Sequence, residues 1–322
     1  MKDCISLFLL FKLNLNDGVK MKKINYTVLI LAAILFLGCS ENNKTSNKIF
    51  VSVLPQKHFV EAITGDKFKV EVMVPPGLSP ATYEPLPKQM LSLSDAKLYF
   101  RIGVPFENSW IDKIADNNKN LKIVDTREGI NLRSFETFEH MEEKHDHHGH
   151  SHGHGHSHDH GEKDPHIWLD PSLVKIQAKT VYESVIKEDP INKEFYLKNY
   201  NSFRQKLDSL DAQLFGICAA AVDNKFLVFH PSWGYFADRY GLRQFSIEYE
   251  GKEPSPMQLA KIIKFIKENN ITTIFVQKQF STKSAETIAL EINGTVKTLD
   301  PLAENYFENL IYMAKTISGS EN

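Results

Sequence analysis

Two series of short apolar runs, separated by amphipathic segments, constrain the fold of this chain more than any other feature. The first series contains the strand-like runs IFVSVL, FKVEVMV, KLYFRIG and LKIVDT. The second contains KFLVFH, RQFSIE, ITTIFVQ and TVKTLD. Strands that alternate with helices predict a parallel sheet with helices on both faces. The sequence therefore predicts an α/β fold with two lobes, each built on its own parallel sheet.

A long helical segment lies between the two series. Residues 172–188 and 192–221 are amphipathic, and Asp189-Pro190 separates them. The second segment would be roughly 45 Å long at the α-helical rise, long enough to span both halves of the molecule. We therefore expect an N-terminal lobe over 49–190, a linking helix over 191–220 and a C-terminal lobe over 221–322. A linking helix of this length predicts that the lobes do not close through a wide hinge.

The N-terminal region reads as a secretory signal. Residues 21–38 (MKKINYTVLILAAILFLG) have a basic start, a short apolar core and a small residue before Cys39. The Leu-Gly-Cys sequence resembles the lipobox of bacterial lipoproteins, which would make Cys39 the lipid-modified first residue of a tether over 39–48. Residues 1–20 are then a mis-called upstream start. We expect an exported lipoprotein, anchored in a membrane and facing the periplasm or cell exterior; an uncleaved N-terminal anchor is the alternative.

Charge and cysteine content exclude several other classes of protein. The formal net charge of −2 gives no electrostatic footprint for nucleic acid. The cysteines are Cys4, Cys39 and Cys218. If the signal is removed and Cys39 is lipidated, Cys218 remains alone. We therefore expect neither an intramolecular disulfide nor a cysteine-rich zinc site.

A histidine-rich stretch over 140–163 indicates that the protein handles a transition metal. Imidazole suits zinc, copper and nickel. The Gly and Ser residues between the histidines leave no apolar face, so a flexible loop is expected. Such a loop lacks the fixed geometry of a defined site, and we expect auxiliary metal binding from it. The histidines expected to bind metal in this loop are His145, His147, His148, His150, His152, His154, His156, His158 and His160.

Three further segments place metal-ligand residues where strands end or prolines fix the backbone. They are DPHIWLDP with His166, FHPSWGYF with His230 and TLDPL with Asp300. Ligands bind at the carboxyl ends of parallel strands, so the expected site is the cleft between the lobes. Two imidazoles and a carboxylate are a ligand set typical of zinc or manganese. His166 packed against Trp168, and Asp300 as a cap of the last helix, are the structural alternatives.

These segments resemble the cluster A-I metal receptors, the solute-binding lipoproteins of zinc and manganese ABC importers, on the zinc-uptake side. The resemblance covers nearly all of residues 49–318. It rests on VPPGLSPATYEP, the histidine-rich loop, DPHIWLDP, FHPSWGYFADRYGL, EGKEPSP, FVQKQFSTKSAETIA and LDPLAENY. It implies two (β/α)4-type lobes joined by a rigid helix, and one metal ion in the cleft held by His166, His230 and Asp300. It also implies docking on a membrane permease, and we expect the receptor to be a monomer.

One position departs from the family pattern. Where the family has Pro-His-x-Tyr-Glu-Pro, this chain has PATYEP, with Ala81 in the ligand position. Zinc accepts three protein ligands and water, but an open position usually belongs to catalytic sites. A fourth donor could come from His58, Glu84 or the histidine-rich loop, and solvent is the remaining alternative.

The leading hypothesis is a receptor that captures Zn²⁺ and delivers it to an importer, with no enzymatic activity. Mn²⁺ is a less favoured cargo because harder metals prefer more carboxylates. A zinc-dependent hydrolase that uses the open position, with Glu84 as its base, is the enzymatic alternative. Against it, the chain has no HExxH motif and no Gly-rich phosphate loop. A metal buffer or adhesin without a transporter partner is the third hypothesis.

Overall fold

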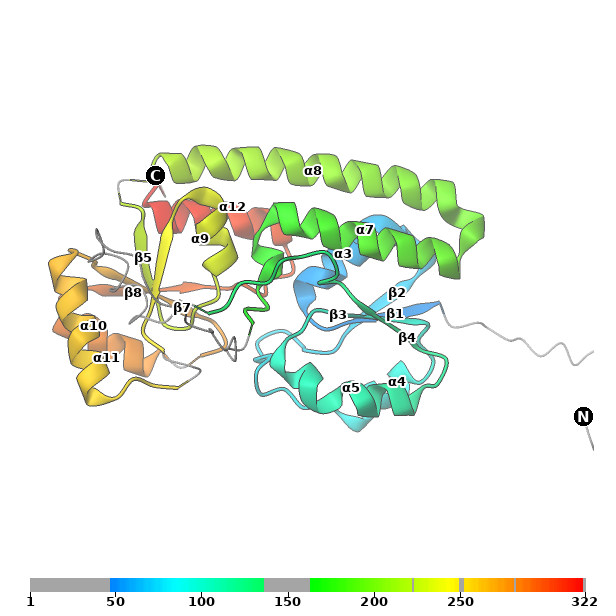
Figure 1. Ribbon diagram of the computed structural model, residues 1–322, viewed down its shortest axis with the longest axis horizontal. Coiled ribbons are helices and arrows are strands. Elements are labelled where there is room, and N and C mark those ends of the chain that lie inside the picture. The colour runs from blue at the N-terminus through cyan, green and yellow to red at the C-terminus, as the bar shows by residue number, and fades with distance from the viewer. Residues whose placement is uncertain (1–46, 136–162, 222, 249–251, 281, 321–322) are drawn as a thin grey trace, which may run out of the picture. The chain divides into compact units, whose positions relative to one another are not determined.

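The first series of strands and helices forms a four-stranded parallel sheet in the computed structural model, which describes residues 47–135, 163–221, 223–248, 252–280 and 282–320. Its elements are β1 (Lys48–Val51), α3 (Leu54–Thr64), η1 (Gly65–Lys67), β2 (Lys69–Val72), α4 (Pro87–Leu93), β3 (Leu98–Arg101), α5 (Pro105–Asn117) and β4 (Lys122–Asp125). The strand order is β2-β1-β3-β4, and Ile49 pairs with both Val70 and Leu98. Helix α3 covers one face of the sheet, and α4 and α5 cover the other (Figure 1).

The second series forms another four-stranded parallel sheet, in the order β6-β5-β7-β8. Its elements are β5 (Lys225–Val228), α9 (Gly234–Tyr240), β6 (Arg243–Ser246), α10 (Pro256–Glu268), β7 (Thr273–Gln277), α11 (Lys283–Glu291), β8 (Thr295–Leu299) and α12 (Tyr306–Ser318). Successive residues of a strand point to opposite faces. Leu227 accordingly packs in a core with α10 and α11, whereas Phe226 and Val228 belong to the larger core shared with α9 and α12.

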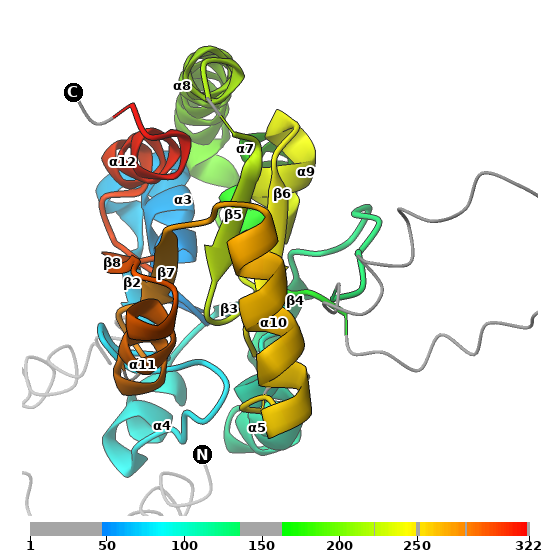
Figure 2. The ribbon, with the colours of Figure 1, turned by 90° about the vertical axis from the view of Figure 1, so that its left-hand side faces the viewer.

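The segment between the sheets contains η2 (Ile167–Leu169), α7 (Pro171–Glu188), η3 (Pro190–Asn192) and the long helix α8 (Lys193–Ala219). Asp170 is the N-cap of helix α7, and its side chain accepts a hydrogen bond from the Ser172 amide. The 27 residues of α8 give it a length of about 40 Å. Figures 1 and 2 show α7, α8 and α12 on the side of the sheets opposite to α4, α5, α10 and α11.

One hydrophobic core extends through both lobes. Helix α8 packs against α3 and α7 on the first lobe and against α9 and α12 on the second. The same core cluster contains Phe50 and Phe100 of the first sheet, Leu207 of α8, and Phe226 and Phe275 of the second sheet. Residues Ser46–Asn322 accordingly form one unit by their contacts. Because side chains from both lobes fill one core, a rotation of one lobe against the other would open packed apolar surface.

The predicted α/β fold with two parallel-sheet lobes and a long connecting helix is confirmed. The predicted strands are longer than the observed ones, and the last helix begins only at Tyr306, well after β8 has ended at Leu299. A turn after β8 delays it, because the Asp300 carboxylate accepts a hydrogen bond from the Leu302 amide. The predicted signal, Cys39 and most of the tether lie outside the described residues. Within the described part of the chain, no helix is long and apolar enough to cross a membrane.

We expect Leu207→Ala to lower the free energy of unfolding by about 2–5 kcal/mol, since it leaves a cavity in the shared core. Leu207 is fully buried in α8. Both lobes should still unfold in one transition. Circular dichroism and tryptophan fluorescence, recorded during urea denaturation, measure this. The exposed Gln205 on the same helix is the control, and its alanine variant should stay within about 0.5 kcal/mol of the parent. Two separate transitions would contradict the shared core.

Candidate metal site

His166 lies on a short buried segment that both lobes hold in place. The segment enters the 3₁₀ turn η2, and the Trp168 ring, 5.1 Å from the imidazole centroid, covers His166 on one side. Trp168 Nε1 donates to the Pro301 carbonyl at 2.8 Å, and the Tyr306 hydroxyl donates to the Trp168 carbonyl at 2.8 Å. The imidazole is therefore fixed in position by contacts with the second lobe, and only 9% of His166 is exposed.

The carboxylate of Asp164 determines which imidazole nitrogen of His166 is free. Its Oδ1 accepts from the His166 amide at 2.9 Å and lies 2.7 Å from Nδ1. A carboxylate only accepts, so Nδ1 carries the proton and Nε2 keeps its lone pair. Burial lowers the pKa of His166, and this effect outweighs the opposing influence of Asp164. The residue is thus a neutral imidazole with an unprotonated Nε2, the form that binds metals.

His230 has the same arrangement in the second lobe. It follows β5 by two residues, and its Nδ1 is hydrogen-bonded to Oε2 of Glu248, which follows β6. The Glu248 amide donates to the Phe229 carbonyl at 2.9 Å, which keeps the carboxylate beside the imidazole. The ring of His230 stacks on Phe280 with the centroids 5.0 Å apart. Glu248 therefore leaves Nε2 of His230 available as well.

The two imidazoles face each other inside an aromatic enclosure. The ring centroids of His166 and His230 lie 5.6 Å apart. Phe135 lies 6.2 Å from the first and 6.5 Å from the second, and Trp168 and Phe280 flank the pair. Two imidazoles this close, each with a carboxylate beside Nδ1, are suited to binding a cation between them.

Residues on either side of 136–162, the range that holds most of the histidine-rich stretch, are joined to one another next to His166. Ser134 and Lys163 form an antiparallel bridge, and the Asp164 amide donates to the Arg133 carbonyl at 3.0 Å. The Tyr235 hydroxyl of α9 donates to the Asp164 carbonyl and accepts from the Arg133 amide, each at 3.0 Å. The loop histidines 145–160 themselves lie outside the described residues.

Asp300 lies near the pair but does not complete a ligand cluster. Its Oδ1 accepts from Gln279 Nε2 and from the Leu302 amide, each at 3.0 Å, and it does not cap α12, whose N-cap is Asn305. The neighbouring Pro301 carbonyl accepts from Trp168, which connects Asp300 to the His166 segment. Over the described ranges, no three His, Cys, Asp or Glu side chains stand close enough to hold a metal ion. The structure therefore brings two predicted ligands, His166 and His230, together, but it does not bring the third, Asp300, into a cluster with them.

The structure places the candidates for a fourth donor elsewhere. Ala81 and Glu84 are exposed in the loop after β2, where the Ala81 amide donates to Ser79 Oγ at 3.2 Å. His58 on α3 packs among aromatic rings from three helices, and its ring contacts are with neither His166 nor His230. These rings belong to Phe59, Phe203, Tyr306 and Phe307.

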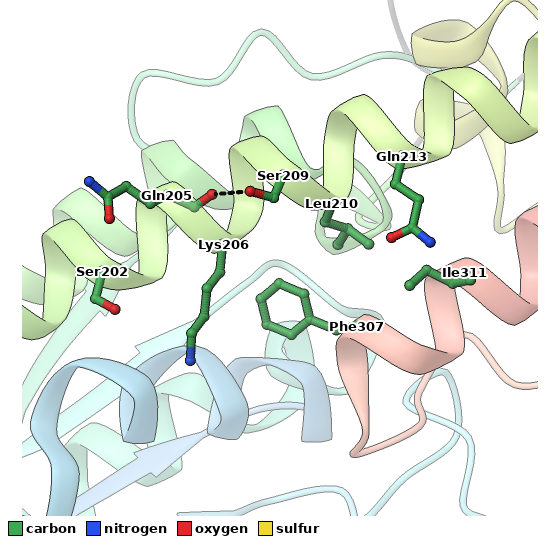
Figure 3. Close-up of a pocket in the computed structure, with 8 residues that line it drawn as sticks. All are labelled: Ser202, Gln205, Lys206, Ser209, Leu210, Gln213, Phe307 and Ile311. Atoms are coloured by element: carbon green, nitrogen blue, oxygen red, sulfur yellow. Dashed lines mark hydrogen bonds between the residues drawn. The ribbon is translucent and has the colours of Figure 1, made fainter.

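Figure 3 shows a surface hollow between α8 and α12, which shares a residue with the aromatic cluster around His58. Its volume is about 450 Å³, and Phe307 belongs both to its lining and to the aromatic cluster around His58. The lining is Ser202, Gln205, Lys206, Ser209, Leu210, Gln213, Phe307 and Ile311. It contains none of the predicted ligands, so it is separate from the imidazole pair.

We expect His58 to make the protein less stable in acid. Burial lowers the pKa of His58 below its ordinary 6.5; Glu308 and Glu304 oppose this and Lys206 reinforces it. The unfolded chain then binds a proton more readily, so stability should fall as the pH drops below about 6.5. His58→Gln should flatten this dependence when the free energy of unfolding is measured by urea denaturation between pH 7.5 and 5. An unchanged slope would show that His58 is not buried as described.

Several residues around the imidazoles were missed by reasoning from the sequence. Asp164 is hydrogen-bonded to His166 and Glu248 to His230. Ser232 contacts His166, and Gln277 donates to Ser232. Glu248 and Gln277 lie at or just beyond the carboxyl ends of β6 and β7, the strands that flank β5. These residues could have been found in the sequence as polar residues at the ends of the strands that flank β5, the strand before His230.

Comparisons with known proteins match both lobes. Residues 49–320 match the family described as "Zinc-uptake complex component A periplasmic". The high-affinity zinc uptake system protein ZnuA of Bacillus subtilis (strain 168) is 30% identical over 294 residues, which cover 87% of this chain and 89% of that protein. The manganese ABC transporter substrate-binding lipoprotein PsaA of Streptococcus anginosus is 28% identical over 294 residues, which cover 85% of this chain and 87% of that protein. The crystal structure of a ZnuA deletion mutant with zinc bound has a TM-score of 0.76 and 40% identity, covering 85% of this chain and 98% of that one.

Proposed function

The chain belongs to the family of periplasmic zinc-uptake components, and from this premise we propose that it captures Zn²⁺ outside the cytoplasmic membrane and delivers it to the permease of an ABC importer. The observation that carries the proposal is the close pair of His166, which is buried, and His230, which is partly buried, each with a carboxylate beside Nδ1. Zinc prefers neutral imidazole nitrogen, and an outer carboxylate raises the basicity of that nitrogen. The zinc uptake and zinc-bound proteins that the chain is similar to support the same cargo.

We propose that Nε2 of His166 and Nε2 of His230 are the two fixed ligands and that Asp300 is the third. Asp300 Oδ1 is engaged by Gln279, so its carboxylate must turn toward the imidazoles when the ion binds. The remaining position lacks the family histidine because Ala81 occupies it. We propose that the histidine-rich stretch supplies this donor. The described residues on either side of it, Ser134 and Lys163, pair with each other next to the His166 segment, whereas His58 lies among aromatic rings and Glu84 is exposed.

Manganese is the second cargo to consider, because a relative is named as a manganese receptor. Manganese favours oxygen donors, whereas the two fixed donors here are imidazoles. We therefore propose zinc as the preferred ion. No contact of Glu84 favours the hydrolase alternative.

We further propose that residues 21–38 are removed as a signal and that Cys39 is lipidated. A lipid on Cys39 would hold the receptor, as a monomer, on a membrane next to its permease. The support is the Leu-Gly-Cys sequence and the relative whose name describes it as a lipoprotein. The histidine-rich stretch then collects zinc near the site and passes it to the imidazoles.

We expect His166→Ala and His230→Ala each to abolish tight zinc binding by the full chain. Loss of a direct ligand should exceed the roughly 10- to 100-fold loss caused by removing an outer-shell partner. A competition titration with a chromophoric chelator measures the dissociation constant. His58→Gln is the matched control and should bind zinc as tightly as the parent. Tight binding in both alanine variants would refute the imidazole site, and weak binding in the control would make His58 a ligand.

We expect a variant with all nine histidines from 145 to 160 replaced by asparagine to bind fewer zinc ions. The tight site should also weaken, because Ala81 leaves it one protein donor short. Zinc stoichiometry by metal analysis and affinity by competition titration measure the two effects separately. If the stoichiometry falls while the affinity of the tight site is unchanged, water completes the site and the stretch serves only as an auxiliary store.

A further inference from the structure

The buried hydroxyl of Ser232 contacts the nitrogen of His166 that would bind the ion. Ser232 is fully buried, and its Oγ lies 3.1 Å from His166 Nε2. The side-chain amide of Gln277, at the carboxyl end of β7, donates to the same Oγ. The Ser232 amide donates to the His230 carbonyl at 2.9 Å, which holds the serine in a tight turn after His230.

The protons in this chain of contacts can be assigned from the partners. Nδ1 of His166 lies 2.7 Å from the Asp164 carboxylate, which only accepts, so Nδ1 carries the proton and Nε2 is the acceptor. Gln277 donates to the Ser232 oxygen and occupies one of its lone pairs. The serine proton is then directed at Nε2. Ser232 therefore donates a hydrogen bond into the lone pair that would coordinate zinc.

We propose that Ser232, oriented by Gln277, competes with Zn²⁺ for Nε2 of His166 and thereby moderates affinity and speeds release of the ion. The inference rests on the proposed role of His166 as a ligand. One lone pair cannot hold a proton donor and a metal ion at once, so binding of the ion breaks the Ser232 bond. When the ion leaves, the hydroxyl satisfies a buried acceptor that would otherwise remain unpaired.

Such competition suits a receptor that must give up its cargo. The shared core opposes release by rotation of the lobes, so the ion must leave through changes among the side chains that hold it. A donor already within 3.1 Å of the ligand nitrogen captures the imidazole with a small rotation about the serine Cα–Cβ bond. Ser232 is thus a positioning residue that acts through His166.

The test compares Ser232→Ala with the full-length parent. We expect the zinc dissociation constant to fall roughly 2- to 12-fold, the factor that corresponds to one net hydrogen bond. Dissociation into excess chelator, followed by stopped flow, should slow. Gln277→Leu should also lower the zinc dissociation constant and slow dissociation, with a smaller effect. This variant replaces Ser232→Ala in the test if Ser232→Ala fails to fold. Ser318→Ala, which removes another buried hydroxyl that bonds Lys315 and Ser320 and no imidazole, should change neither quantity.

Nitrogen NMR of the zinc-free protein separates this proposal from the proposed function. In the parent, the His166 ring should be the Nδ1–H tautomer with a hydrogen-bonded Nε2, and Ser232→Ala should move the Nε2 resonance toward that of an unbonded nitrogen. Weaker or unchanged zinc binding in Ser232→Ala, with the resonance unmoved, would overturn the competition. Tight zinc binding by His166→Ala would instead overturn the proposed function, and with it the role of Ser232.

Discussion

The hydrophobic core shared by the two lobes fixes everything else in this structure. Helix α8 buries Phe203 and Leu207 against the first lobe and against α12, and side chains from both sheets fill the same cluster. Burial of this apolar surface stabilises one relative placement of the two lobes. His166, on the segment that leads into α7, and His230, after β5, can therefore be set 5.6 Å apart by the fold alone. The imidazole pair is pre-organised, and no closure of the lobes is needed to form it.

In the proposed site, burial of His166 and the two carboxylates would favour a metal ion over a proton. Desolvation lowers the pKa of His166, and the nearby His230 acts in the same direction. Asp164 and Glu248 each accept from an Nδ1, so both Nε2 lone pairs are directed away from the carboxylates. A proton added to His166 would be buried without water, whereas a metal ion is coordinated by two nitrogens at once. The enclosure by Phe135, Trp168 and Phe280 strengthens this difference because it excludes water.

The sequence predicted the fold and the paired histidines because both depend on local pattern. Alternating apolar runs define the two sheets, and His230 follows one of those runs. The partners of the histidines depend on strand order instead: Glu248 and Gln277 reach the site because β6 and β7 flank β5, an arrangement that spacing alone does not reveal. His58 was ambiguous because a position early in α3 does not specify which neighbours its side chain meets. Its aromatic partners come from α8 and α12, far along the chain.

The loop that carries Ala81 is held in place by hydrogen bonds of the first lobe, although alanine cannot coordinate a metal ion. The Pro80 carbonyl accepts from the Phe106 amide at 3.1 Å, which ties the loop to the start of α5. Glu107 beside it is fully buried and accepts from Ser52 Oγ at 2.6 Å and from the amides of Ile102 and Gly103. This network stabilises the carboxyl edge of the first sheet independently of any metal. Replacing a ligand by alanine in such a loop removes a donor without removing the structure that presented it. A donor from another part of the chain can then complete the site while the fold stays unchanged.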